Sequence, residues 1–274
     1  MKRCKFPRAV FYRRVPPEKL ISLPWVEMWL LVSLIFFTAK FWVLHADGKR
    51  GGAWDKTAFL LFWPGMNFRE FVRKPAGKRP LVLRGCINLA IGIVLTWFVA
   101  RHVPHRFFAT WIAMIGFIWA LHGGVITLAA AFWRWRGRDV NPLMFEPLLA
   151  TSLADFWGRR WNRAFRDFSH RFLFQPTVGK LGARGAMLVV FFISGLLHEV
   201  VVTVPARGGY GLPTLYYLLQ GIGMIVETRL PARSLVLRRL FAFVVLVVPL
   251  SLGFPAEFVR NVAEPFFRSI HALS

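Results

Sequence analysis

The chain has 274 residues, of which 56% are hydrophobic and 16% aromatic, and its formal net charge of +23 comes from 36 Lys and Arg residues against 13 Asp and Glu residues. This apolar content exceeds what a soluble core of this length uses, so the composition excludes an ordinary soluble domain and predicts an all-α integral membrane protein. A soluble protein of this charge would be expected to bind nucleic acid. Here the basic residues fall between apolar runs, and we expect no nucleic-acid partner.

The chain begins with a basic arm, residues 1–23, followed by the first long apolar run. That run is too long, and lacks the small-residue cleavage site, for a removed signal peptide, so we expect it to remain as an anchor. The remainder, residues 24–274, is predicted to form one multi-span domain. The two cysteines, Cys4 and Cys86, give neither a disulfide framework nor a metal-ligand spacing, and no metal is expected.

Apolar runs long enough to cross a bilayer recur along the chain. A spanning helix needs about 20 mainly apolar residues. A shorter run, Ala53 to Met66, predicts a half-span or re-entrant piece. The sequence therefore predicts a polytopic bundle of about 6 to 8 transmembrane or re-entrant helices. The predicted spans are Pro24–His45, Leu81–Ala100, Phe107–Trp133, Gly185–Val204, Leu212–Val226 and Leu240–Phe254.

Basic residues are concentrated in alternate connections between these runs. Cytoplasmic connections of membrane proteins carry an excess of Lys and Arg, which predicts a multi-pass protein with a cytoplasmic N-terminus. In a prokaryote the host would be the cell (inner) membrane. The predicted cytoplasmic segments are the arm, Asn67–Arg84, Arg134–Arg184 and Arg229–Arg239.

Residues 151–172 have the pattern of an aromatic, basic, amphipathic helix at a membrane interface. Ser152 with Asp155 predicts the capped start, and Pro176 predicts an end close by. Its cations could serve anionic lipid, or they could meet a phosphorylated cosubstrate while the amide of Asn162 faces a site. The pattern alone leaves both functions open. The cations are Arg159, Arg160, Arg163 and Arg166.

His198 lies within the apolar run 185–202. Ionisable groups at membrane depth are costly and are retained mostly where they line a cavity or a site, so His198 is the first candidate for chemistry. Ser194, one turn earlier on the same face, could orient the imidazole, whereas Glu199 points elsewhere and is expected to pair elsewhere. A helix carries His198 about 21 Å from Arg184 at about 1.5 Å per residue. It can meet Asn162 only if the amphipathic helix dips inward.

Two motifs therefore stand in order along the chain, one ending at Asn162 and one containing His198. The first resembles the Phe-Tyr-x-Asp-Trp-Trp-Asn signature of the membrane-bound O-acyltransferases (MBOAT), and the second resembles that family's buried histidine motif. Their wording is most similar to the wax synthase-like branch, with support from residues 63–66 and 208–213, so the resemblance covers residues 63–274. The motifs are Phe156-Trp157-Gly158-Arg159-Arg160-Trp161-Asn162 and Ser194-Gly195-Leu196-Leu197-His198-Glu199.

The chain departs from this family at two places. The pair Arg160-Trp161 stands where sterol and diacylglycerol acyltransferases have Trp-Trp, which argues against those branches. Only one predicted span precedes Trp63, where relatives have more. Either the enzyme is minimal or its start lies upstream, and both alternatives stay open.

The resemblance implies an MBOAT-like bundle that moves a fatty acyl group from acyl-CoA to the hydroxyl of a lipophilic alcohol, as a wax ester synthase does. It implies His198 as general base and Asn162 as its partner, with acyl-CoA as cosubstrate and no bound cofactor or metal. A neutral intramembrane imidazole suits a base, and an amide N–H suits a developing oxyanion. The residues implied to bind substrate are Trp157, Arg159, Arg160, Trp161, Arg163 and Ser194.

Other functions are compatible with parts of the pattern. The same pair of residues could acylate or acetylate a small polar acceptor. A transporter would also explain an intramembrane His together with Gln220 and Glu227, but the inverted repeats of that class are missing from the sequence. A non-catalytic membrane scaffold is the least specific alternative. The acceptor, the acyl chain length and self-association cannot be deduced from these residues.

Overall fold

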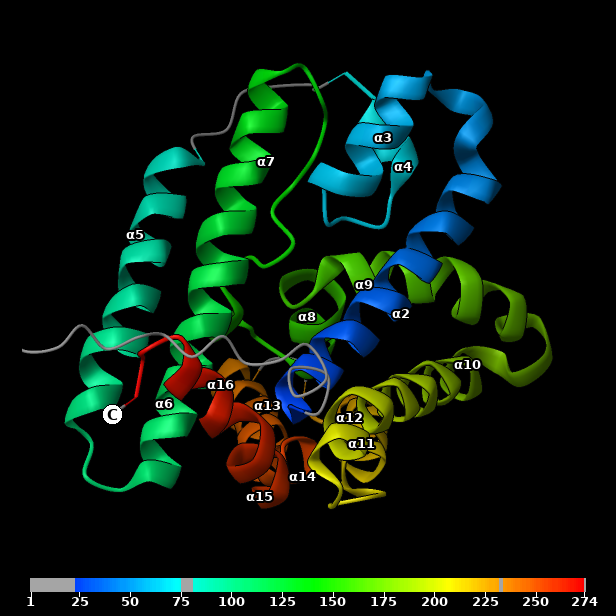
Figure 1. The fold of residues 1–274 in the computed structure, drawn as a ribbon. Coiled ribbons are helices and arrows are strands. Elements are labelled where there is room, and N and C mark those ends of the chain that lie inside the picture. The colour runs from blue at the N-terminus through cyan, green and yellow to red at the C-terminus, as the bar shows by residue number, and fades with distance from the viewer. Residues whose placement is uncertain (1–22, 75–80, 232–233, 274) are drawn as a thin grey trace, which may run out of the picture.

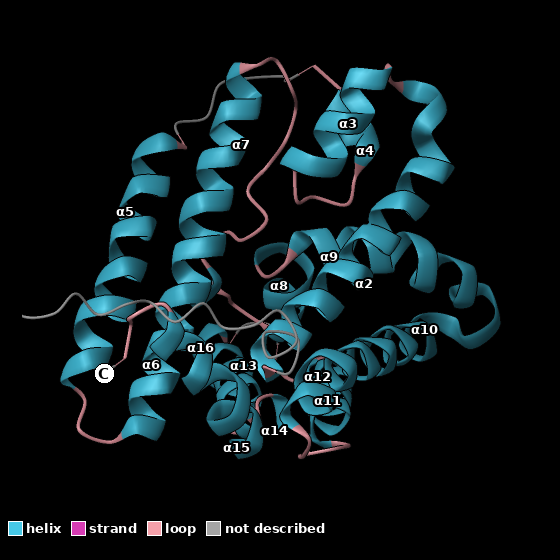
Figure 2. Ribbon diagram, viewed as in Figure 1, coloured by secondary structure: helices cyan, strands magenta, loops and turns pink. Residues whose placement is uncertain are grey.

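The computed structural model describes residues 23–74, 81–231 and 234–273, and these form helices and connections without any strand (Figure 2). The predicted basic arm lies outside the described residues except for Leu23. The all-α class is thus confirmed for the described chain. Many large apolar side chains are on the surface, such as Leu83 and Val236 at 72% and 79% exposure. A soluble protein rarely exposes such continuous apolar surface, whereas a lipid environment solvates it.

Five helical stretches of the described chain are long and apolar enough to cross a membrane, and each contains or overlaps a predicted span. Pi-helical and 3₁₀ turns interrupt several of them. Their elements are α2 (Pro24–Asp47) with η1 (Gly48–Arg50); α5 (Val82–Ile93), η2 (Val94–Val99) and η3 (Ala100–His102); α6 (Arg106–Ile118), η4 (Trp119–Val125) and α7 (Ile126–Trp135); α9 (Arg163–Ser169), η7 (His170–Phe174), α10 (Gln175–His198), η8 (Glu199–Thr203) and α11 (Val204–Ala206); and α13 (Leu235–Val247) with α14 (Leu250–Gly253).

The remaining elements are shorter. The predicted short run forms a ten-residue helix, and the run after residue 211 forms a sixteen-residue helix. The C-terminal helices were not predicted, because their apolar residues are interrupted by charges. These elements are α3 (Ala53–Phe62), α4 (Phe68–Val72), η5 (Pro147–Leu149), α8 (Leu153–Asp155), η6 (Phe156–Arg160), α12 (Leu212–Glu227), α15 (Ala256–Phe258), η9 (Val259–Ala263) and α16 (Glu264–Ser269).

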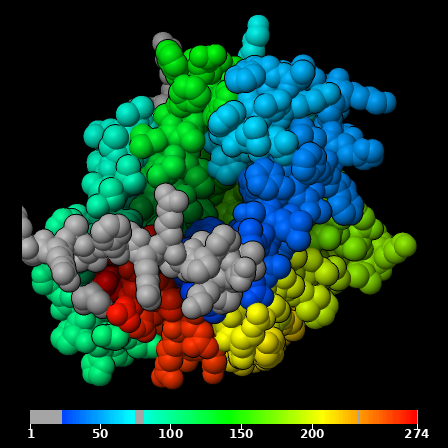
Figure 3. Space-filling view, viewed as in Figure 1, coloured from blue at the N-terminus to red at the C-terminus, as the bar shows by residue number. Residues whose placement is uncertain are grey.

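The helices form two groups around a central segment (Figure 1). Helices α5, α6 and α7 pack on one side, and α10 packs against α12 on the other, while α8 and α9 lie between them. The C-terminal segment, red in Figure 3, lies beside the α5–α6 group. Trp97 anchors it by donating from Nε1 to the carbonyl of Ile270 at 3.2 Å. The C-terminal segment is thereby tied to the α5–α6 group.

Lys40 is completely buried on α2 and holds the end of α3 in place. Its ammonium donates to the carbonyl oxygens of Phe59, Trp63 and Gly65 at 2.8, 2.5 and 2.6 Å. It also lies 3.4 Å from the centroid of the Phe59 ring. Carbonyls at a helix end have no partner within the helix, so the ammonium supplies the hydrogen bonds that lipid cannot. This explains how a polar turn at residues 63–65 can lie among apolar helices.

The chain does not stop at Pro176 as the sequence predicted. Pro176 lies at the start of α10, directly after the π-helical turn η7, and the backbone on both sides of it is helical, so the helical path continues through it. The reversal comes instead at Gly182, whose backbone has φ 68° and ψ 173°. Positive φ of this kind is accessible to glycine at little cost. The stretch before Gly182 and the stretch after it therefore fold back on each other.

Ion pairs show what lies at each end of α2. Near its start, Glu27 accepts from Arg207 Nη2 at 2.7 Å. At its end, the buried carboxylate of Asp47 accepts from Arg69 Nε at 2.8 Å and from Arg171. The 24 residues of α2 extend for about 36 Å. A crossing α2 thus places Arg207 and Arg69 on opposite sides of the membrane.

This arrangement bears on the predicted side of the N-terminus, which stays a prediction. The sequence placed the arm before Pro24 on the same side as residues 67–84, but the contacts of α2 place Pro24 at the far end from Arg69. The charge count could not detect this, because it treats the short apolar run as a possible crossing. In the structure, α3 ends in the turn held by Lys40 and returns the chain to the side it left.

Helices α10 and α12 touch at Gly195, where a Cβ atom would lie 2.6 Å from the Cα atom of Thr214. We expect Gly195→Ala to push the two helices apart and to destabilise the protein by about 1–3 kcal/mol, the usual cost of overpacking. The measurement is the Tm of the detergent-purified variant. Gly179→Ala is the matched control on the same helix, since no atom lies within 4 Å of the added carbon. Equal Tm values for the two variants would contradict this packing.

Candidate active site

The predicted amphipathic helix over residues 151–172 is not one helix. Ser152 caps its start as predicted, accepting from the backbone N–H of Asp155 at 2.9 Å. The helix then ends after η6, Trp161 is extended, and Asn162 has a left-handed backbone with φ 36° and ψ 60°. A new helix, α9, starts at Arg163. The first motif is thus a helix, a turn and a second helix.

The preceding loop explains this break. Phe145 donates its backbone N–H to the carbonyl of Arg160 at 2.8 Å, and Leu143 accepts from the N–H of Arg163 at 2.9 Å. The turn at residues 161–162 therefore finds its backbone partners outside itself. The rings of Phe156 and Trp161 stack across the turn, with centroids 5.4 Å apart. Helical periodicity in the sequence carries no information on such a loop, which is why the prediction failed here.

Glu227, at the end of α12, anchors the start of residues 151–172, the segment that contains the first motif and is called the motif segment below. Its carboxylate is buried and accepts from the backbone N–H groups of Leu153 and Ala154 at 2.8 and 3.2 Å. The first N–H groups of a helix have no intrahelical acceptor, and a negative charge there is favoured by the helix dipole. The contact joins residues 73 and 74 positions apart.

Asp155 fixes the far side of the same segment. Burial acts to raise the pKa of its carboxyl, but hydrogen bonds from the Thr151 backbone and from Arg160 outweigh burial, so the pKa lies below its ordinary value. The Arg160 Nε atom lies 2.6 Å from the carboxylate. This pair contributes stability above the ordinary Asp pKa and loses it as the pH falls through the lowered one. Arg160 is therefore engaged within the segment, and its predicted role in binding substrate stays a prediction.

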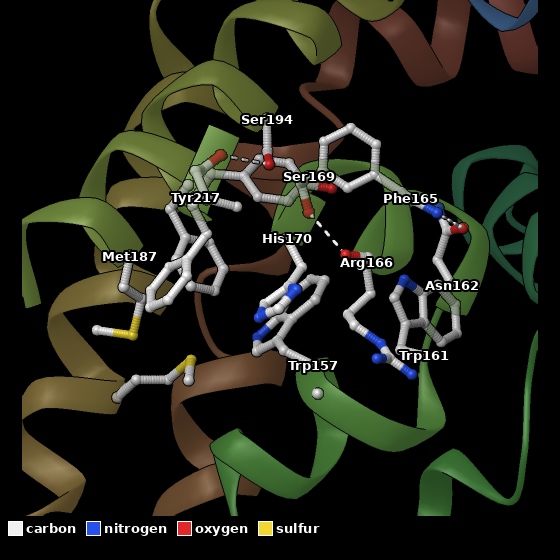
Figure 4. Close-up of a pocket in the computed structure, with 15 residues that line it drawn as sticks. Trp157, Trp161, Asn162, Phe165, Arg166, Ser169, His170, Met187, Ser194 and Tyr217 are labelled. Carbon is white, nitrogen blue, oxygen red and sulfur yellow. Dashed lines mark hydrogen bonds between the residues drawn. The ribbon is translucent and has the colours of Figure 1, made fainter. Parts of the chain in front are cut away.

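A cavity of about 350 Å³ opens between the motif segment and helices α10 and α12 (Figure 4). Its polar lining includes Asn162 from the turn, Ser194 from α10 and Tyr217 from α12. Both motifs therefore contribute to one cavity. The apolar wall includes Trp157, Trp161, Phe165, Phe191, Met187 and Met224.

Asn162 has a structural contact as well as a place in the cavity wall. Its side-chain oxygen accepts from the backbone N–H of Phe165 at 3.2 Å and so caps α9 (Figure 4). Asn is among the residues that tolerate a left-handed backbone and is a favoured N-cap. Because the cap uses the amide oxygen, the NH₂ end of the same amide is left for a ligand.

His198 is bonded on both ring nitrogens. Nδ1 lies 2.7 Å from the backbone carbonyl of Ser194, and Nε2 lies 2.8 Å from the hydroxyl of Tyr217. The Ser194 hydroxyl instead donates to the carbonyl of Val190 at 2.7 Å, so Ser194 orients the ring through its backbone and not through its side chain. Glu199 bonds to Thr203, Thr214 and the N–H of Gly211, away from the ring as predicted.

The structure separates the residues predicted to bind substrate. Trp157, Trp161 and Ser194 line the cavity, and so does Asn162. The Arg159 side chain is 82% exposed near Asp155, and Arg163 lines a different, much smaller cavity with Glu70 and Asp167. Of Arg159, Arg160, Arg163 and Arg166, it is Arg166 that lines the main cavity. Its buried Nε atom has no hydrogen-bond partner among the described residues.

Tyr217 is a polar group of this site that the sequence did not predict, as are Ser169 and His170 in the same cavity wall. It is nineteen residues after His198 and on another helix, so no helical spacing relates the two. Its ring lies 4.4 Å from the His198 ring and 5.8 Å from Trp157, between centroids. A signal was present in principle, because a phenol inside an apolar span needs a hydrogen-bond partner.

Comparison with known proteins identifies relatives for part of this chain. The model of the membrane bound O-acyl transferase family matches residues 140–218, which contain both motifs. The predicted resemblance is thus confirmed, over a narrower range than residues 63–274. The long-chain-alcohol O-fatty-acyltransferase of Simmondsia chinensis is 36% identical over 152 residues, which cover 50% of this chain and 41% of that protein.

Two further relatives come from Arabidopsis thaliana. A probable long-chain-alcohol O-fatty-acyltransferase 8 is 39% identical over 100 residues, covering 33% of this chain and 30% of that protein. An acyl-CoA–sterol O-acyltransferase 1 is 28% identical over 129 residues, covering 44% and 37%. A sterol acyltransferase is therefore also similar, although Arg160-Trp161 argued against that branch. The chain spans less than half the length of these relatives.

We expect Glu227→Ala to release the start of the motif segment, because the buried N–H of Leu153 and the part-buried N–H of Ala154 lose their acceptor. The loss should cost about 1–3 kcal/mol for the buried group and lower the Tm in detergent. Glu257→Ala is the control, since Glu257 is an exposed carboxylate in the same bundle. An unchanged Tm for Glu227→Ala would show that water or lipid replaces the carboxylate.

Proposed function

We propose that this chain, whose residues 140–218 match the membrane bound O-acyl transferase family, transfers a fatty acyl group from acyl-CoA to the hydroxyl of a lipophilic alcohol. The protein would be a membrane enzyme of the wax ester synthase type. Acyl-CoA would be a cosubstrate, and no bound cofactor is invoked. The relatives named as long-chain-alcohol O-fatty-acyltransferases support this choice of reaction.

The observation that carries the proposal is the shared cavity. Asn162 from the first motif lines it, and the second motif reaches it through Ser194 and through Tyr217, which is bonded to His198. A reaction between a thioester and an alcohol needs a base for the hydroxyl and a donor for the developing oxyanion. His198 would be the base and the Asn162 amide the donor, both beside the space where the substrates would meet.

The cavity wall favours a lipophilic acceptor over a small polar one. Tryptophan, phenylalanine and methionine contribute seven of its fifteen lining residues, and the walls of ligand sites usually match the polarity of what they bind. A sugar would leave its hydroxyl groups without partners against such a wall. Arg166 is the cation placed to meet a negatively charged part of acyl-CoA, because it is the arginine of the segment that lines the cavity.

The test is the product formed when purified protein receives a radiolabelled fatty acyl-CoA and a panel of alcohols. We expect labelled ester with long-chain alcohols and none from His198→Ala. The variant should still be made and inserted, because removing a buried polar group leaves apolar packing in place. Ester formation by His198→Ala at the wild-type rate would remove the base assignment, and the absence of ester with every alcohol would remove the function.

Asn162→Gly separates the proposed chemistry of Asn162 from its cap in the same assay. Glycine accepts the left-handed backbone and costs an N-cap only a few tenths of a kcal/mol compared with Asn. The Tm should therefore hardly change, whereas the rate at saturating substrate should fall by about 10² to 10³ if the amide stabilises an oxyanion. An unchanged rate would leave Asn162 with its structural role alone.

We propose further that the basic side of the bundle faces the cytoplasm. Arg73 and Arg138 pair with Asp139 and Asp55, which joins the predicted cytoplasmic segments at 67–84 and 134–184 on one side. The positive-inside rule makes that side cytoplasmic. The cytoplasmic N-terminus predicted from charge would then require α2 not to cross, and the contacts of Glu27 and Asp47 favour a crossing.

Cysteine labelling with a membrane-impermeant maleimide tests this orientation in oriented vesicles lacking Cys4 and Cys86. We expect Lys74→Cys and Arg159→Cys, at exposed positions, to react from the cytoplasmic side, and Tyr210→Cys to react from the other. A variant that retains Cys4 alone reports the side of the arm, which should match Tyr210→Cys. Reaction of Arg159→Cys with reagent outside the cell would reverse the assignment.

A further inference from the structure

The hydrogen bonds of His198 determine which way its contact with Tyr217 runs. The carbonyl of Ser194 can only accept, so the neutral imidazole carries its proton on Nδ1. Nε2 is then an acceptor, and the Tyr217 hydroxyl donates to it across 2.8 Å. The nitrogen that would act as base is therefore already occupied by a phenolic proton.

Tyr217 also stands between His198 and the cavity. Tyr217 lines the cavity, together with Trp157 and Ser194, whereas His198 is not among the described residues that do so. The Tyr217 ring covers the His198 ring with centroids 4.4 Å apart. An alcohol bound in the cavity thus meets Tyr217 before it meets the imidazole. That oxygen donates one hydrogen bond and has lone pairs left to accept another.

We propose, on the basis of the acyltransferase function above, that Tyr217 is a catalytic residue that passes the proton of the substrate hydroxyl to His198. The alcohol O–H donates to the phenolic oxygen while the Tyr217 proton moves to Nε2 of His198. The alcohol oxygen bonds to the thioester carbonyl carbon, and the C–S bond then breaks. The proton returns through Tyr217 to the leaving thiolate, giving the ester and the free thiol and restoring both residues.

A different role for Tyr217 makes the opposite prediction. If Tyr217 only holds the imidazole in place, the incoming alcohol displaces the phenol and bonds to Nε2 directly. Removing the hydroxyl would then free Nε2 for the alcohol and would keep or raise the rate. If Tyr217 passes the proton, its removal leaves a gap between the alcohol and the base. Position-matched variants can therefore decide between the two roles.

The deciding comparison is Tyr217→Phe against Tyr216→Phe. Phenylalanine keeps the ring contacts of Tyr217, and the neighbouring Tyr216 is buried with its hydroxyl donating to the carbonyl of Leu246 at 3.2 Å. We expect kcat of Tyr217→Phe to fall by about 10² to 10⁴, the range typical of proton transfer, with an unchanged KM for acyl-CoA. Tyr216→Phe should keep the wild-type kcat. A kcat at or above wild type for Tyr217→Phe overturns the proposal.

A second measurement holds even if Tyr217→Phe folds poorly. Replacing Tyr217 by 3-fluorotyrosine keeps the hydroxyl and the ring but makes the phenol more acidic, so a phenol in the proton path should shift the pH–rate profile. A phenol that the alcohol displaces would leave the pH profile of kcat unchanged, and that result overturns the proposal. If Tyr217→Phe makes ester as fast as wild type while His198→Ala makes none, only the Tyr217 role fails. If wild type makes none, the function itself fails.

Discussion

The architecture depends on one constraint, that backbone groups freed at helix breaks must find partners where lipid offers none. Charged side chains meet it at three places. Lys40 holds the carbonyls that follow α3, Glu227 holds the N–H groups that start α8, and Glu199 holds the start of α12. Such charges would be costly within a bilayer if they were unpaired, but here each is hydrogen-bonded to backbone groups. The breaks that carry the motifs are therefore built into the bundle and are not surface irregularities.

Helix α12 organises the site because it contacts both motifs. Its last residue, Glu227, fixes the motif segment, and its middle presents Tyr217 to His198. The close approach at Gly195 sets its distance from α10. Side chains that are distant in sequence are therefore held at one cavity by rigid helix contacts. Reacting groups need such fixed positions. Separate loops would hold the same groups less accurately.

The sequence predicted the parts of the molecule that obey a local rule. Spans follow from the length of apolar runs, and the Ser152 cap follows from a spacing of three residues, so both were predictable. The turn at Asn162 was not, because its partners lie in the loop at residues 143–145. Tyr217 was not predicted either, since its contact with His198 depends on how two helices cross. The helical pattern gave no reason to distinguish among the arginines of the motif segment. Helix packing makes Arg166 the one of the four considered that lines the main cavity.

Asn162 combines a left-handed backbone, a helix cap and a position in the cavity wall. Few side chains satisfy even the first two, so selection on folding alone would already restrict this position to a small set of residues. Intolerance to substitution here, in a deep mutational scan, would therefore not by itself indicate catalysis. At His198, by contrast, the backbone is ordinary helix, and intolerance there would report on the side chain.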